Sequence, residues 1–154
     1  MLKTLKDLFD AFTAPDEESP QQRAHALELA TAVLLVEVMR ADPALQTAER
    51  RAVVKALHEK FGLPDEALAR LVEQAEVTAR NASDFYQFTS RINERLAHPQ
   101  KIQVIENMWQ VAYADAHLHA NENHLISKMA DLLYVTHGEY IGAKMRAKER
   151  AGLA

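Results

Sequence analysis

The sequence predicts an all-α protein with about seven helices packed into one compact domain, and three observations support this prediction. Only four of the 154 residues are glycine and five are proline, which is too few for a β-rich chain with many tight turns. Alanine is abundant while valine and isoleucine are modest, and this balance favours helix over strand. Apolar residues recur with helical spacing along the chain, and no alternating pattern competes with it.

The first predicted helix is a short amphipathic one at residues 1–14. Its apolar side chains recur every three or four residues: Leu2, Leu5, Leu8, Phe9 and Phe12. Residues 15–19 are polar and proline-flanked, so we predict a linker there. The helical domain itself is predicted to span residues 20–154.

Capping and helix-breaking residues set the predicted boundaries of the helices in this domain. Ser19 followed by Pro20 is a typical N-cap and first-turn pair, and Pro43 ends the helix that begins there. Thr47 is predicted to cap the next helix, which ends near Gly62. The seven helices are expected at about 20–40, 47–60, 64 onward, 84–96, 99–114, 121–135 (capped by Asn121) and 138–150.

Charge and cysteine content exclude several classes of protein. The chain carries 18 Lys and Arg against 22 Asp and Glu, a formal net charge of −4, so no nucleic-acid partner is expected. The absence of cysteine excludes thiol nucleophiles, redox pairs and thiolate zinc sites. No apolar run is long enough to span a membrane and no signal peptide is evident, so we expect a cytoplasmic protein.

A repeated segment is the most informative feature of the sequence. VMRADPALQTAERRAVVKAL aligns with VAYADAHLHANENHLISKMA at a shift of 73 residues, which pairs Asp42 with Asp115 and Glu49 with Glu122. Each copy predicts a helix that ends at the Asp, a short loop with an inserted leucine, and a second helix with the Glu in its first turn. We therefore predict an internal duplication of a helix–Asp–loop–Glu–helix hairpin, with a pseudo-twofold axis between the copies.

The four acidic residues of the repeat are candidate metal ligands. A short loop folds the second helix back on the first, so that the Asp and the Glu of one hairpin can face each other. The pseudo-twofold axis could bring Asp42, Glu49, Asp115 and Glu122 together. Carboxylate oxygens are hard ligands, suited to Ca²⁺ or Mg²⁺ and tolerable for Mn²⁺, with Zn²⁺ less favoured.

A structural role explains part of the same pattern. A glutamate in the first turn of a helix stabilises that helix by about 0.3–1 kcal/mol, which accounts for Glu49 and Glu122 without an ion. Asp42 and Asp115 oppose the dipole at a helix C-terminus, but they could close Asx-turns onto the loop amides. The sequence leaves a metal site and a structural turn lock equally open. An EF-hand is excluded because its alternating ligand pattern is missing.

Other candidate groups have simpler interpretations. Three histidines near the second hairpin are interpreted as exposed loop side chains rather than metal ligands: His117, His119 and His124. An aromatic group is interpreted as core packing: Phe85, Tyr86, Phe88, Trp109 and Tyr113. Four cations near the C-terminus are interpreted as a solvated helix face: Lys144, Arg146, Lys148 and Arg150. HExxH, GxSxG and glycine-rich phosphate-loop motifs are absent, so an enzyme is not favoured.

With these motifs the chain resembles the TerB-like family, named from tellurite-resistance proteins. The matching stretches are LLVEVMRAD with Glu49, SDFYQFTSRIN, and MWQVAYAD with Glu122 followed by HLISKMADLLYVTHGEYIGAKMRA. The resemblance implies an all-helical fold with two duplicated Asp/Glu hairpins, acidic residues that bind a metal ion, and no established catalytic activity. Glycine usually follows the Asp in this family, whereas Pro43 and Ala116 follow it here, so the first loop is expected to differ.

Two functions follow from these expectations. The first is a non-enzymatic helical domain that binds a divalent cation through the paired hairpins, in a stress- or metal-resistance-related role. The alternative is a protein-interaction or co-chaperone-like adaptor in which the acidic motifs are structural turn locks. The apolar face of residues 1–14 is expected either to pack on its own domain, which is the favoured interpretation, or to contact a protein partner, a second copy of the chain or a membrane surface.

Overall fold

A computed structural model describes residues 19–41, 47–114 and 120–153 of the chain. Seven helices lie in these ranges, which contain no strand, so the predicted all-α fold with about seven helices is confirmed. The helices are α2 (Pro20–Ala41), α3 (Thr47–Phe61), α4 (Asp65–Asn81), α5 (Tyr86–Arg95), α6 (His98–Ala112), α7 (Ala120–Leu132) and α8 (His137–Arg150). The predicted helix at 1–14 lies outside the described residues.

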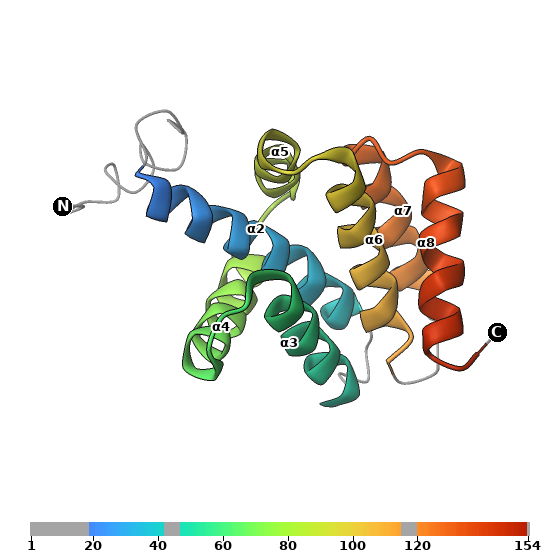
Figure 1. Cartoon of the computed structure of the whole chain (residues 1–154), viewed down its shortest axis with the longest axis horizontal. Helices are drawn as coiled ribbons and strands as arrows, with labels where there is room; N and C mark the ends of the chain where they lie inside the picture. Colours follow the sequence, from blue (N-terminus) through green and yellow to red (C-terminus); the bar gives the residue numbers. More distant parts are fainter. Residues whose placement is uncertain (1–18, 42–46, 115–119, 154) are drawn as a thin grey trace.

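Helix α2 runs through the centre of the molecule, and five other helices pack around it (Figure 1). It packs against α3, α4, α5, α6 and α7. Helices α6, α7 and α8 gather at the right of the view, with α8 outermost and packed mainly on α6. The chain therefore builds two groups of helices, one around α2 and one around α6, which meet where α2 and α6 contact each other.

The sequence of α2 explains its central position. The seven consecutive residues from Ala30 to Val36 are all buried, as are Val38 and Met39. Consecutive buried residues cover every face of a helix, so α2 has no solvent-facing side over this stretch. The amphipathic helices α4 and α5 instead bury one stripe each, with Leu68, Leu71 and Val72 of α4 turned inward.

Most predicted boundaries agree with the observed helices to within two residues. Ser19 caps α2 as predicted: its Oγ accepts a hydrogen bond from the backbone N–H of Gln22 at 3.1 Å, and Gln22 Oε1 accepts one from the N–H of Ser19 at 2.8 Å. The prediction that Asn121 caps its helix is wrong, because α7 already begins at Ala120. Helix α5 begins at Tyr86 rather than at Asp84, because Asp84 Oδ1 accepts a hydrogen bond from the N–H of Tyr86 at 3.0 Å and so precedes the helix.

A bidentate ion pair joins α3 to α4. Arg50 donates to Glu76 through Nη1 at 2.6 Å and Nη2 at 2.9 Å. The hydrogen bonds from Arg50 hold the pKa of Glu76 below its usual value, with a further contribution from the charges of Arg50 and Arg80. Both carboxylate oxygens of Glu76 accept a hydrogen bond from a different nitrogen of Arg50. Such bidentate pairs are stronger and more directional than single ion pairs.

Glu76→Gln is expected to lower the free energy of unfolding at pH 7 by up to about 1 kcal/mol, as for partly exposed ion pairs. The folded-state pKa of Glu76 is depressed, so its stabilisation is complete above the unfolded pKa of about 4.3 and is lost as pH falls through the folded value. Urea unfolding at pH 7 and near pH 2.5 measures both limits, and the variants should converge at acid pH. Glu73→Gln, on the exposed side of the same helix, is the control. If Glu76→Gln lowered the free energy of unfolding by the same amount at both pH values, the Arg50–Glu76 ion pair would not be the cause of the loss.

Among the described residues, none of the helices combines the length and apolar character that crossing a membrane requires.

Candidate functional site

The structure describes two of the four predicted metal ligands, Glu49 and Glu122. Asp42 and Asp115 lie outside the described residues. Glu49 is in the first turn of α3 and Glu122 is in the first turn of α7, as the repeat predicted. Each helix follows one of the two acidic turns.

Both glutamates are completely buried, with 0% of each residue exposed. On the next turn of each helix, Val53 and Ile126 are also 0% exposed. Helix α3 packs on both α2 and α6, and α7 packs on the same two helices. The face of α3 that carries Glu49 and Val53, and the face of α7 that carries Glu122 and Ile126, therefore point into the protein interior rather than toward solvent.

Burial of a carboxylate needs compensation. Transfer of an ionised group from water into the protein interior is costly unless hydrogen bonds, opposite charges or a metal ion offset that cost. The first turn of a helix offers part of that compensation, because its unbonded N–H groups and its dipole favour a negative charge. The two glutamates therefore share the same local setting, buried in the first turn of a helix, and both the metal site and the turn lock require this setting.

A cavity of about 310 Å³ is lined by α3 and by the ends of α6 and α8. Its wall includes Ala52, one turn after Glu49, together with Tyr113 and Ala114, which directly precede Asp115. The middle and end of α3, the end of α6 and the end of α8 therefore line one cavity, and neither Glu49 nor Glu122 is among its lining residues.

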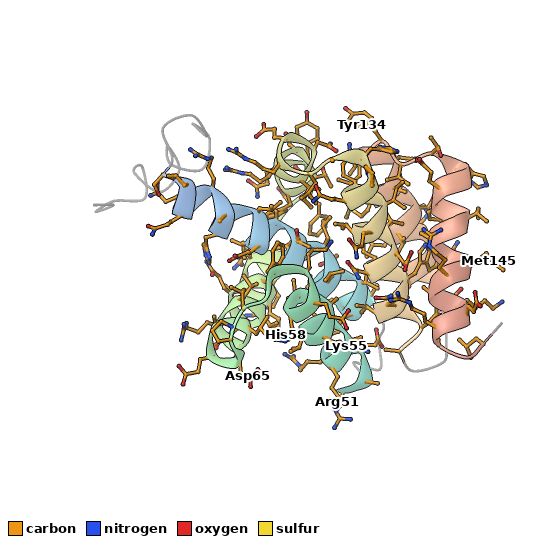
Figure 2. The ribbon with its side chains drawn as sticks, viewed as in Figure 1. Arg51, Lys55, His58, Asp65, Tyr134 and Met145 are labelled. Atoms are coloured by element: carbon orange, nitrogen blue, oxygen red, sulfur yellow. The ribbon has the colours of Figure 1, made fainter. Side chains whose placement is uncertain are left out.

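Polar groups from three helices line this cavity. Lys55 and Glu59 come from α3, Gln110 from α6, and Arg150 from the end of α8; Figure 2 labels Lys55 on α3. Burial raises the pKa of the Tyr113 hydroxyl, with a smaller contribution from Tyr140. The sequence contains no local signal for the cavity, since its lining residues lie almost a hundred positions apart.

The described residues contain no group of three or more His, Asp or Glu side chains placed to hold a metal ion. Of the three histidines near the second hairpin, His124 is exposed as predicted but lies in helix α7 rather than in a loop, and His117 and His119 lie outside the described residues.

The aromatic prediction is correct for four residues and wrong for one. Phe88, Trp109 and Tyr113 are buried and Phe85 packs partly buried against the core. Tyr86 is 67% exposed, because it lies on the solvent side of α5 between the two inward phenylalanines.

Trp109 forms the centre of an aromatic cluster that joins α6 to α8. Its ring stacks on Tyr113 with centroids 5.9 Å apart and lies 5.4 Å from the ring of Tyr140. Lys144 Nζ lies 5.1 Å from the centroid of the same ring, and Arg146 Nε donates to Glu106 Oε1 at 2.5 Å. Two of the four C-terminal cations therefore bind α6, whereas they were predicted to be only solvated.

The comparison with protein families gives a clear result. The family model described as tellurite resistance protein TerB matches residues 28–145, which is well over half of the chain and includes every helix except the last turns of α8 and the first turns of α2. No curated protein and no solved structure matches the chain. The chain therefore belongs to the TerB tellurite resistance family.

Proposed function

We propose that this chain is a non-enzymatic, cytoplasmic TerB-family domain that binds a divalent cation through Asp42, Glu49, Asp115 and Glu122, in a stress- or metal-resistance-related role. The observation that carries the proposal is the complete burial of Glu49 and Glu122 at the starts of two helices that pack on the same central pair. Ca²⁺, Mg²⁺ and Mn²⁺ are the ions that an all-carboxylate oxygen site favours.

The packing of α3 against α6 supports convergence of the two hairpins on one ion. Ala52 follows Glu49 by one turn, Ala114 directly precedes Asp115, and both line the same wall. The closeness of α3 to the end of α6 therefore supports a ligand set drawn from both hairpins.

An internal duplication would explain why the two turns match, and the helix starts support it. Helix α7 begins 73 residues after α3, at Ala120 and Thr47, and α8 begins 72 residues after α4, at His137 and Asp65. Buried residues of one half correspond to buried residues of the other half at the same two shifts, 73 and 72 residues. Val53 corresponds to Ile126 at a shift of 73, and three further buried pairs correspond at a shift of 72: Leu68 and Tyr140, Leu71 and Ala143, and Ala75 and Ala147.

The helix contacts support the same symmetry. Exchange of α2 with α6, α3 with α7 and α4 with α8 turns the α2–α4 contact into the α6–α8 contact and the α2–α7 contact into the α3–α6 contact. In this proposal, two three-helix units pack around α2 and α6, and α5 joins them. The two acidic hairpins are then equivalent sites in the two units.

Calorimetric titration of the full chain with Ca²⁺, Mg²⁺, Mn²⁺ and Zn²⁺ tests the proposal. We expect binding of at least one oxygen-preferring ion, with affinity reduced by about tenfold or more in Asp42→Asn/Asp115→Asn, since a carboxylate ligand is lost from each hairpin. Glu66→Gln/Glu73→Gln makes the same change in net charge on the exposed side of α4 and should bind like the wild type. Absence of binding by the wild type, or equal binding by the aspartate variant, would refute the metal site.

The adaptor hypothesis is the second candidate, and the helix positions of the two glutamates favour it. Both lie in a first turn, where a negative charge stabilises a helix without an ion. In this case Asp115→Asn would lower the melting temperature equally with and without added metal. Residues 1–14 would then supply the contact with a protein partner, a second copy of the chain or a membrane surface.

A further inference from the structure

Another cavity lies at the opposite edge of the molecule from the cavity that Lys55 lines. It has a volume of about 270 Å³ and is formed by α5 and the C-terminal end of α7. Two tyrosines and two carboxylates line it: Tyr86 and Glu94 from α5, and Asp131 and Tyr134 from the end of α7. Figure 2 places Tyr134 at the top of the view, far from Lys55 of the first cavity at the bottom.

The two tyrosines are the most exposed large hydrophobic side chains among the described residues. Tyr134 is 72% exposed and Tyr86 is 67% exposed. An aromatic side chain at a solvated rim, with its polar tip in water, is typical of an interaction surface. Both rings belong to the same cavity although 48 positions separate them in sequence.

The backbone of Tyr134 adopts a conformation that is costly for a residue with a side chain. Tyr134 has φ +60°, and it is the one residue other than glycine with positive φ in the described chain. It follows α7 in a Schellman motif, in which the N–H of Val135 donates to Ala130 O at 2.9 Å and the N–H of Tyr134 donates to Asp131 O at 3.1 Å. Glycine usually occupies this position, because a bulky residue is strained there.

The chain already places one of its own ammonium groups on this ring. Lys101 Nζ lies 5.5 Å from the centroid of Tyr134 and donates to Asn93 Oδ1 at 3.1 Å. Asn93 Nδ2 in turn donates to Leu132 O at 3.0 Å, which ties α5 to the end of α7. Asn93 therefore holds the two walls of the cavity together, and its side chain positions a cation beside the tyrosine.

The carboxylates of this cavity remain available to a ligand. Within the described residues, neither Glu94 nor Asp131 forms an ion pair, and both are exposed. Lys101 contributes one positive charge nearby, so the cavity residues and Lys101 together carry a net charge of −1. Aromatic rings combined with carboxylates recognise ammonium and guanidinium groups, through cation–π attraction and charge-assisted hydrogen bonds.

We propose that the Tyr86–Tyr134 cavity binds a lysine or arginine side chain from a basic segment of a partner protein. The partner's cation would lie between the two tyrosine rings and the carboxylates of Glu94 and Asp131. The charge of the cavity argues for a basic segment, and its small volume matches one side chain rather than a folded surface. The proposal does not depend on metal binding at the acidic turns, because the two cavities share no residue.

Titration of the ¹⁵N-labelled full chain with a short lysine-rich peptide, followed by NMR, tests the proposal. We expect chemical-shift changes confined to α5 and the end of α7, and no binding of the same peptide with its lysines acetylated. Tyr134→Gly should weaken binding by about tenfold while its melting temperature equals or exceeds that of the wild type, because glycine removes the strain at positive φ. Tyr134→Phe should keep the affinity, since the ring rather than the hydroxyl is required.

The charge variants provide the second test. Glu94→Gln/Asp131→Asn should weaken binding to a similar extent, while Glu66→Gln/Glu73→Gln, with the same change in net charge on α4, should not. Wild-type affinity in Tyr134→Gly, equal binding of the acetylated peptide, or shifts spread over other helices would each overturn the proposal. Failure of the metal titration would leave this experiment unaffected.

Discussion

Trp109→Ala is expected to lower the free energy of unfolding by about 3–5 kcal/mol, the range for truncation of a large aromatic residue in a core. Trp109 is 0% exposed and contacts Tyr113, Tyr140 and Lys144. Its removal would leave a cavity at the place where α8 packs on α6. Because small domains are stable by only about 5–15 kcal/mol, this loss is a large share of the total. Trp109 is the one tryptophan of the chain, so unfolding is followed by far-UV circular dichroism.

Two further variants test whether the loss of stability comes from the packing of Trp109. Trp109→Phe should cost less than half as much, because it keeps an aromatic ring and also removes an indole N–H that has no hydrogen-bond partner among the described residues. Tyr86→Ala, at a residue that is 67% exposed, should change stability by less than about 0.5 kcal/mol. A Trp109→Ala protein as stable as the wild type would show that α8 does not depend on this aromatic cluster.

Local signals in the sequence predicted most of the fold. Ser19 with Pro20 marks the start of α2, and Pro64 directly precedes α4, because capping and proline geometry act within a few residues. Two predicted boundaries differ from the structure by one or two residues. Asp84 bonds the N–H of Tyr86 and delays the start of α5, and α7 begins one residue before its predicted cap, Asn121.

The candidate sites show where sequence reasoning stops. The 73-residue repeat predicted that Glu49 and Glu122 lie in first turns, because it compares the chain with itself. It could not predict their complete burial, which results from packing of α3 and α7 on α2 and α6. The Tyr134 cavity was missed altogether. Tyrosine gives no signal for a left-handed helix end, where glycine is the usual residue, and the partner Tyr86 was interpreted as core.

Glu49→Gln/Glu122→Gln is expected to abolish stabilisation by divalent cations. If an ion binds the native state alone, saturation at about 100 times its dissociation constant adds roughly 2.7 kcal/mol, which raises the melting temperature of a domain of this size by about 5–10 °C. The amide oxygens of glutamine keep the shape of the side chain but carry no charge, so the ion loses two of its four proposed ligands. Thermal unfolding with chelator and with Ca²⁺, Mg²⁺ or Mn²⁺ measures the difference, and Glu66→Gln/Glu73→Gln is the control of equal charge.

The behaviour in chelator separates the two functions. In the adaptor hypothesis each buried carboxylate acts through charge-assisted hydrogen bonds worth about 1.5–3 kcal/mol, so the double variant would lose stability to the same extent with and without metal. In the metal-site proposal the ion-free wild type confines like charges in a water-excluded region, and their neutralisation offsets part of the lost hydrogen bonding. The stability gap between wild type and variant should then be small in chelator and widen as the ion is added. A gap that stays constant across the ion titration would assign Glu49 and Glu122 to the fold rather than to a cation.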